Sequence, residues 1–340
     1  MDRAKLPLAL TLGDPAGIGP DITLAAWLAQ RQERIPAFVL LGDPTVLEQR
    51  AEALGLRVAI VTIAEPEAAE ERFAEELPVL PIPVARPVTA GHPDTAAAPA
   101  IMQSVERAVS LVRQGKAAAV VTNPISKAVL YGAGFPFPGH TEYLAALASA
   151  EGRPLHPVMM LASPTLKVVP VTIHVPLKDV PPLLTQDLIL ATLEITARDL
   201  GRYFGVERPR LAVSGLNPHA GEDGGLGREE IDIIAPAIAA ARAKGLNVTG
   251  PHPADTLFHG GARATYDAAI CMYHDQALVP FKTLAFEEGV NVTLGLPLIR
   301  TSPDHGTAFG IAGTGQASPR SLIEALRLAA AMREKTEARA

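Results

Sequence analysis

Short apolar stretches alternate along the chain with longer segments in which apolar residues recur every three or four positions. The short stretches have the length and composition of strands that are buried on both faces of a sheet. They cover residues 8–12, 37–41, 58–63, 117–121, 158–161, 168–172, 211–213 and 268–272. Alternation of such strands with helical segments predicts an α/β fold with a largely parallel sheet.

Several of the helical segments have recognisable ends. The clearest begins at Asp94, whose carboxylate is a good N-cap, and ends at Gly115. A second is expected over 185–204, and the last begins at Ser318-Pro319, where proline takes the first helical position. Between these two lies a helix with an apolar stripe that a second subunit could cover. The stripe consists of Ile231, Ile234 and Ile238.

One segment of the first half breaks the alternation. Residues 78–93 hold five prolines. Because proline lacks the N–H group that a central strand donates to its neighbour, the segment is predicted to be an extended surface connection and not a strand.

Composition and charge exclude several classes of protein. The length of 340 residues corresponds to about two domains, and 48% hydrophobic residues exclude a disordered chain. A net charge of −6 without clusters of Lys and Arg argues against binding nucleic acid. The single cysteine, Cys271, excludes an intramolecular disulfide. No apolar run is long enough for a membrane span, and the first apolar stretch lacks a cleavage pattern, so we expect a cytoplasmic protein.

Three of the nine histidines directly follow predicted strands. They are His174, His219 and His274. In open α/β sheets the carboxyl ends of the strands form the edge where ligands bind, so three imidazoles could converge there. Three nitrogen ligands with one open position are typical of catalytic zinc. For each histidine taken alone an ordinary loop residue is the favoured interpretation, whereas three at equivalent strand ends favour a metal site, although no short metal motif is present.

Other polar residues indicate binding of anions. A helical stretch opens at Gly139-His140-Thr141, where free backbone N–H groups suit a phosphate or a carboxylate, although a plain helix cap is the alternative. Three further polar residues recur every nine positions within otherwise apolar sequence: Lys282, Asn291 and Arg300. They could bind a phosphate or a carboxylate, or they could be exposed residues at strand ends. A lysine could also act as a general acid or base.

Neither glycine-rich loop matches a standard nucleotide motif. Residues 13–19 form a glycine turn between a strand and a helix, but they lack the third glycine of G-x-G-x-x-G. Residues 217–227 hold four glycines beside His219 without the Gly-Lys-Ser/Thr of a P-loop. The four glycines of residues 217–227 indicate a close approach of the backbone to another group.

Several long stretches of the sequence are specific enough to identify a family resemblance. They are LGDPAGIGPD, GHTEYLA, GLNPHAGEDGGLGREE, PADTLF, MYHDQ and GVNVTLGLPLIRTSPDHGTAFGIAG, and they span about Leu10 to about Leu326. They closely resemble the 4-hydroxythreonine-4-phosphate dehydrogenase family of the pyridoxal 5′-phosphate pathway. The resemblance implies the two-domain isocitrate/isopropylmalate dehydrogenase-like fold, with α/β/α sandwiches, a cleft between the domains and a homodimer whose active sites use both subunits. We expect a nucleotide-side domain of 1–130 plus 297–340 and a substrate, metal and dimerisation domain of 131–296.

The resemblance also implies a role for each candidate residue. His174, His219 and His274 would bind a divalent metal, with Zn²⁺ expected and Mg²⁺ or Co²⁺ as alternatives. Substrate contacts would be His140, Thr141, Lys282, Asn291 and Arg300, and Lys282 is also the candidate catalytic group near the reacting centre. NAD or NADP would bind the loop of Asp304, His305, Gly306, Thr307 and Ala308. Where the wider fold family has HGSAPDIAG, this chain has Phe309-Gly310 in place of Pro-Asp.

The implied reaction is oxidation of a phosphorylated secondary alcohol, 4-phosphooxy-L-threonine. A metal acts as Lewis acid, hydride passes to the nicotinamide, and the resulting 3-oxo acid loses CO₂ to leave 3-amino-2-oxopropyl phosphate. Related dehydrogenases that act on 4-phospho-D-threonate, phospho-erythronate or an aromatic dihydrodiol dicarboxylate are alternatives. An alternative of another class is a non-enzymatic, metal-dependent protein that binds a small molecule.

Overall fold

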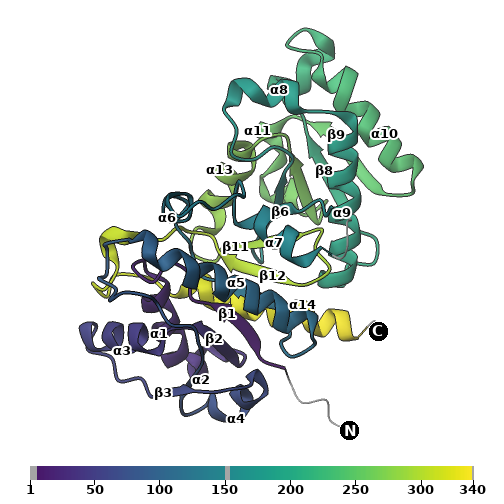
Figure 1. The fold of residues 1–340 in the computed structure, drawn as a ribbon. Helices are drawn as coiled ribbons and strands as arrows, with labels where there is room; N and C mark the ends of the chain where they lie inside the picture. The colour runs from purple at the N-terminus through teal and green to yellow at the C-terminus, as the bar shows by residue number, and fades with distance from the viewer. Residues whose placement is uncertain (1–5, 150–153, 339–340) are drawn as a thin grey trace. The chain divides into compact units, whose positions relative to one another are not determined.

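The computed structural model describes residues 6–149 and 154–338 (Figure 1). The chain forms two compact units. The first comprises the described residues of Met1–Pro157 and Leu296–Glu334, and the second those of Val158–Gly295 and Lys335–Ala340. The predicted second domain begins at residue 131, whereas residues 131–149 and 154–157 are grouped with the first unit. The roles expected of the two domains stay predictions.

A parallel sheet organises the first unit. Its strands run in the order β3-β4-β2-β1-β5-β12, and every neighbouring pair is parallel. They are β1 (Leu8–Thr11), β2 (Phe38–Gly42), β3 (Ile60–Thr62), β4 (Leu77–Pro81), β5 (Val120–Thr122) and β12 (Arg300–Pro303). The predicted α/β class is confirmed, and the chain returns to this sheet through β12 after passing through the second unit.

Both faces of this sheet are covered. Ala9 and Val39 pack with Val105 of α5 in one apolar cluster. Leu8 and Leu10 alternate with Ala9, so they point to the opposite face, and they are buried as well. The helices are α1 (Gly19–Leu28), α2 (Gln30–Glu33), α3 (Pro44–Ala53), α4 (Ala69–Arg72), α5 (Ala98–Arg113), α6 (Lys127–Gly132), α7 (His140–Ala148) and α14 (Arg320–Glu337), with 3₁₀ turns at Pro66–Ala68, Thr95–Ala97 and Phe309–Ile311.

The proline-rich segment is the clearest error of the sequence-based prediction. Leu77–Pro81 forms β4, which pairs with β2 on one side and β3 on the other. Leu77, Val79 and Leu80 are completely buried. Pro78 and Pro81 stand near the two ends of the strand, where a missing N–H costs little pairing, so burial of the three apolar side chains outweighs it.

The second unit has a mixed sheet. Its strands run in the order β11-β6-β7-β10-β8-β9. The pairs β11–β6 and β6–β7 are antiparallel, and the remaining pairs are parallel. The strands are β6 (Val158–Ala162), β7 (Lys167–Pro170), β8 (Arg210–Ser214), β9 (Asn247–His252), β10 (Ala268–Cys271) and β11 (Val290–Leu294).

The helices of the second unit correct the interpretation of the isoleucine stripe. Ile234 and Ile238 are buried within the unit's own core, and only Ile231 is exposed. The helices are α8 (Val180–Leu183), α9 (Gln186–Phe204), α10 (Ala235–Ala243), α11 (Ala254–Leu257), α12 (Gly260–Arg263) and α13 (His274–Ala285), with 3₁₀ turns at Leu177–Asp179 and Pro218–Gly224 and a π-helical turn at Glu230–Ile234. Among residues 6–149 and 154–338, no helix combines the length and the apolar character needed to cross a membrane.

Candidate active site

The three selected histidines follow three neighbouring strands of the second unit. β10 pairs in parallel with β7 on one side and with β8 on the other, so the carboxyl ends of all three strands lie at one edge of the sheet. His174 lies shortly after β7, His219 lies in the loop after β8, and His274 opens α13 after β10. The sheet therefore delivers three histidine-bearing segments to the same edge.

His174 and His274 lie next to each other. Their ring centroids are 5.6 Å apart, and both rings line a hollow of about 220 Å³ together with Thr172 and Tyr273. His274 Nδ1 lies 2.7 Å from a carboxylate oxygen of Asp275, a contact that orients the ring and leaves Nε2 for another partner. Two imidazoles bound to one tetrahedral zinc ion have centroids about 5 Å apart, so this pair fits a shared ion.

His219 is not part of this pair. The residue is exposed and lies in a loop where His219, Ala220, Glu222 and Asp223 all have positive φ angles between 42° and 53°. Among the described residues, no three His, Cys, Asp or Glu side chains are grouped so that they could hold a metal ion. The single chain thus brings together two of the three expected ligands.

Glu230 shapes the loop that carries His219. Its carboxylate is 3% exposed and accepts hydrogen bonds from the backbone N–H groups of Leu216 and Asn217, both at 2.7 Å. Its other oxygen accepts from Asn217 Nδ2 at 2.9 Å. A Cβ atom on Gly221 would lie 2.6 Å from that same oxygen, so only glycine fits there. One buried carboxylate therefore fixes the start of the loop at Leu216 and Asn217, and Gly221 packs closely against it.

Arg300 is a buried cation in the first unit. Its side chain is 4% exposed in β12, and Nη2 donates to the Thr122 hydroxyl of β5 at 2.7 Å. Burial lowers the pKa of Arg300 to about 10. A guanidinium that the fold has removed from water is a strong site for an anionic group.

His140 adds a neutral ring beside this cation. Burial, and after it the charge of Arg300, lowers the pKa of His140 well below its usual range, so the ring is neutral at pH 7. His140 Nε2 is buried and has no hydrogen-bond partner among the described residues. A buried ring nitrogen of this kind is suited to a ligand, because a missing partner is costly.

The helix that carries His140 presents its N-terminus without a side-chain cap. Gly139 is the N-cap of α7, and no side chain accepts from the first N–H groups. A Cβ atom on Gly139 would lie 2.8 Å from a carboxylate oxygen of Glu142 and 3.5 Å from Lys127 Nζ. Thr141, a predicted substrate contact, is the second residue of the helix. The backbone donors, Lys127 and Arg300 favour an anion such as a phosphate or a carboxylate, and they outnumber the opposing carboxylate of Glu142.

Lys282 and Asn291 belong to the second unit. Lys282 lies in α13 and not at a strand end, with Nζ 5.3 Å from the centre of the Phe286 ring. Asn291 lies in β11, paired with Leu161 of β6. Both side chains are half-buried. Their predicted roles toward the substrate stay predictions.

The loop from Asp304 to Gly313 belongs to the first unit and follows β12. The N–H of Asp304 donates to Ser321 Oγ at 3.0 Å, and the carbonyl oxygen of Thr307 accepts from the N–H of Ile18 at 3.0 Å. A Cβ atom on Gly17 would lie 2.9 Å from that carbonyl oxygen. The glycine turn 13–19 thus permits close packing against the loop. The other expected nucleotide residues, His305, Gly306 and Ala308, are exposed.

Four charged residues around these sites were not singled out by the sequence. They are Asp21, Arg50, Lys127 and Glu230. Each lies in or beside a helix with ordinary polar spacing, so nothing local marks it as buried or as close to a candidate site. The buried pair of Asp21 and Arg50 depends on partners far along the chain, and the burial of Glu230 depends on the conformation of the loop before it.

Comparison with known proteins relates these sites to a family. The family model described as pyridoxal phosphate biosynthetic protein PdxA matches residues 34–329. A curated 4-hydroxythreonine-4-phosphate dehydrogenase from Methylorubrum populi is 62% identical over 326 residues, which cover 95% of this chain and 93% of that protein.

Solved structures agree in fold. The crystal structure of 4-hydroxythreonine-4-phosphate dehydrogenase from Klebsiella pneumoniae superposes with a TM-score of 0.87 at 39% identity, covering 98% of this chain and 99% of the other. A terephthalate 1,2-cis-dihydrodiol dehydrogenase from Burkholderia xenovorans has a TM-score of 0.62 at 27% identity, covering 96% and 97%. The family model and the identity over nearly the whole length lead to one conclusion: the chain belongs to the PdxA family of pyridoxal phosphate biosynthetic proteins.

Proposed function

We propose that this protein is an NAD(P)-dependent dehydrogenase that oxidises 4-hydroxythreonine 4-phosphate in the biosynthesis of pyridoxal 5′-phosphate. The observation that carries the proposal is the buried Arg300 beside the neutral ring of His140 and the uncapped N-terminus of α7. This arrangement suits an anion. The relatives that align with nearly the whole chain are named for a phosphorylated substrate.

We assign substrate binding to five residues. Arg300 would hold an anionic group of the substrate through its planar fork, and the N–H groups at the start of α7 with the Thr141 hydroxyl would hold the same or a second anion. His140 would offer its neutral Nε2 to a substrate hydroxyl or amine. Asn291 and Lys282 would complete the polar contacts.

The chemistry requires loss of a hydride and a proton from one secondary alcohol. A bound NAD(P)⁺ would supply the hydride acceptor, and Lys282 is the candidate base that would take the hydroxyl proton. The new carbonyl is β to the substrate carboxylate. Loss of CO₂ then leaves 3-amino-2-oxopropyl phosphate.

We further propose that a divalent metal, Zn²⁺ above all, is held by His174, His219 and His274. The spacing of the His174 and His274 rings supports two of these ligands, and three neutral imidazoles form the donor set that zinc prefers. A bound ion would act as a Lewis acid toward the substrate oxygen. Because the chain alone groups only two of the histidines, we assign the completion of the site to a homodimer in which both subunits contribute.

The exposed apolar side chains of the second unit support such a dimer. Leu177, Val279 and Phe286 are 66%, 62% and 72% exposed, which is unusual for side chains of this size. Leu177 also lines the hollow of His174 and His274. Sedimentation of the protein at assay concentration should give a dimer, and a fully active monomer would overturn this assignment.

The proposed reaction is tested by following reduction of NAD⁺ and of NADP⁺ with added Zn²⁺, Mg²⁺ or Co²⁺. The substrates to compare are 4-hydroxythreonine 4-phosphate, 4-phospho-D-threonate, phospho-erythronate and the cis-dihydrodiol of terephthalate. We expect the first to give the highest kcat/KM. A clear preference for another acid would move the protein to a related dehydrogenase. No turnover with any of them, and no nucleotide binding with metal and substrate present, would favour a binding protein.

A further inference from the structure

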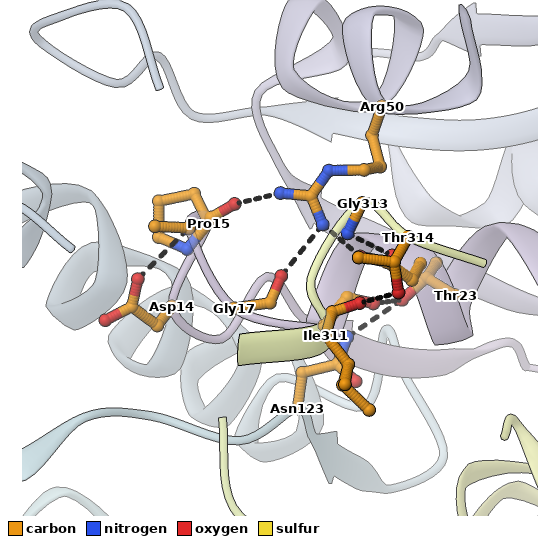
Figure 2. A network of polar contacts seen from close by, with 12 residues as sticks. Asp14, Pro15, Gly17, Thr23, Arg50, Asn123, Ile311, Gly313 and Thr314 are labelled. Atoms are coloured by element: carbon orange, nitrogen blue, oxygen red, sulfur yellow. Dashed lines mark hydrogen bonds and ion pairs between the residues drawn. The ribbon is translucent and has the colours of Figure 1, made fainter. Parts of the chain in front are cut away.

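A buried ion pair lies beneath the loop assigned to the nucleotide. Asp21 in the first turn of α1 pairs with Arg50 of α3, and the two side chains are 3% and 4% exposed. Figure 2 shows Arg50 beside Pro15 and Gly17, with Gly313 nearby. Neither residue is among those assigned to substrate, metal or nucleotide. Their partners show what the pair holds.

Each member of the pair makes further hydrogen bonds to backbone. Arg50 Nη1 donates to the carbonyl oxygen of Gly17 at 2.9 Å, and Nη2 donates to that of Pro15 at 3.1 Å. Asp21 uses one carboxylate oxygen for Arg50 and the other to accept from the N–H of Gly313 at 2.7 Å. The pair thereby joins three segments that are distant in sequence: the turn 13–19, α3 and the loop after β12.

The loop has little else to fix its far end. Within 304–315 only Ala312 is buried, and the residues from 305 to 310 are exposed or half-buried. Its near end is tied by the bond from Ile18 N–H to the Thr307 carbonyl oxygen. The bond from Gly313 to Asp21 ties the far end. Gly313 has a φ of +74°, and a Cβ atom there would lie 3.0 Å from the Cβ of Ala90, so the backbone must approach closely.

We propose that Asp21 and Arg50 act as a positioning pair that sets the conformation of loop 304–315 for binding NAD(P)⁺. The proposal rests on the assignment of this loop to the nucleotide. Asp21 holds the loop directly. Arg50 orients the Asp21 carboxylate, and at the same time fixes the turn on which the near end of the loop packs. A loop that is ordered before the nucleotide arrives loses less entropy on binding.

The pair has a specific kinetic signature. Asp21→Asn keeps the shape of the side chain and one acceptor oxygen but removes the charge that Arg50 requires. Arg50→Met removes the cation and its three bonds. We expect the KM for the nucleotide to rise about tenfold or more in both variants, while the KM for the phosphorylated substrate stays within about twofold. Arg50→Lys keeps the charge without the fork and should recover part of the loss.

A second readout follows the loop itself. Hydrogen–deuterium exchange of residues 304–315, measured without nucleotide, should be faster in both variants than in the wild type. Trp27→Phe is the matched control, because Trp27 lies in the same helix and its Nε1 donates to the Phe73 carbonyl oxygen at 3.0 Å, away from the loop. This control loses a buried bond and should leave both loop exchange and nucleotide KM unchanged. The double variant Asp21→Asn/Arg50→Met should be no worse than Arg50→Met alone, since the two residues act as one device.

The outcomes separate the pair from the proposed function. Loop exchange and nucleotide KM equal to those of the Trp27→Phe control would overturn the positioning role. If Arg50→Met does not fold, Asp21→Asn alone decides, because it is isosteric. If the wild type binds neither NAD⁺ nor NADP⁺ with Zn²⁺ and substrate present, the nucleotide assignment fails, and the positioning proposal fails with it even when loop exchange responds.

Discussion

Replacing Arg300 should move stability and substrate binding in opposite directions. Burial lowers the pKa of Arg300 from 12.5 to about 10, so the folded protein disfavours its charged form. A difference of about 2.5 pKa units corresponds to about 3 kcal/mol. Arg300 is a base whose pKa is depressed in the folded state, so its positive charge lowers the free energy of unfolding. The full penalty is present below pH 10, including the whole neutral range, and is relieved only as the pH rises from about 10 to 12.5.

Arg300→Met removes this penalty. The change also removes the hydrogen bond to the Thr122 hydroxyl, which is worth about 1–2 kcal/mol, so the net gain in free energy of unfolding is at most about 2 kcal/mol. For a unit of this size, that gain raises Tm by up to roughly 8 °C in the absence of substrate. With substrate at about 100 times its Kd, the wild type should gain about 2.7 kcal/mol, and the variant should gain almost nothing.

Differential scanning calorimetry and steady-state kinetics together test this reasoning. Arg300→Lys should lower kcat/KM by roughly tenfold to a thousandfold, because it keeps the charge and loses the fork, with the NAD⁺ KM nearly unchanged. Arg210→Met is a suitable control, since Arg210 is an exposed arginine paired with Asp267, and its loss should not raise Tm. A lower Tm for Arg300→Met without substrate would show that the guanidinium serves the fold. A raised NAD⁺ KM with an unchanged substrate KM would place Arg300 on the nucleotide side.

Three further predictions concern the histidines and the loop of His219. Burial depresses the pKa of His140, so the stability that its neutral ring provides is present above the unfolded pKa of 6.5 and is lost as the pH falls. His140→Gln should therefore reduce the pH dependence of the free energy of unfolding below pH 6.5, measured by urea denaturation, by up to about 1.4 kcal/mol per pH unit. An unchanged slope would contradict the assignment. His219→Ala should abolish metal-dependent turnover and leave the circular dichroism spectrum intact, and full activity after chelator treatment would exclude His219 as a ligand. Glu230→Gln should weaken Zn²⁺ binding, measured by calorimetry, by about tenfold through the loop it shapes, and wild-type affinity would show that the loop does not need the carboxylate.

Periodicity predicted the elements whose local signals agree with their packing. The helix from Asp94 and the helix over 185–204 are present, with Asp94 and Thr185 as N-caps whose side chains accept from the first turn. The error at β4 has a different cause. Proline content is a local signal, whereas the pairing of β4 between β2 and β3 depends on strands that lie elsewhere in the chain. Local propensity predicts secondary structure correctly only where pairing with distant segments does not override it.

The candidate site shows the same division. Strand ends are visible in the sequence, so His174 and His274 could be selected, and the structure brings their rings together. Arg300 could be selected as a candidate for binding anions because its neighbours are apolar, and the structure buries it in β12. The roles of Asp21 and Glu230 could not be predicted, since their partners at Gly313 and Asn217 are fixed by tertiary packing and loop geometry.

The route of the chain has a consequence for synthesis on the ribosome. The first unit is left at Pro157 and completed only by Leu296–Glu334, so all 138 residues of Val158–Gly295 are translated in between. At about 5–20 residues per second, this interval lasts roughly 7–28 s. During this interval β12 has not yet been made, so β5 is an open edge of the sheet. The Asp21 carboxylate also has not yet received the hydrogen bond from the Gly313 N–H. The nascent protein therefore has a defined window in which the edge of β5 is open to pairing with another chain.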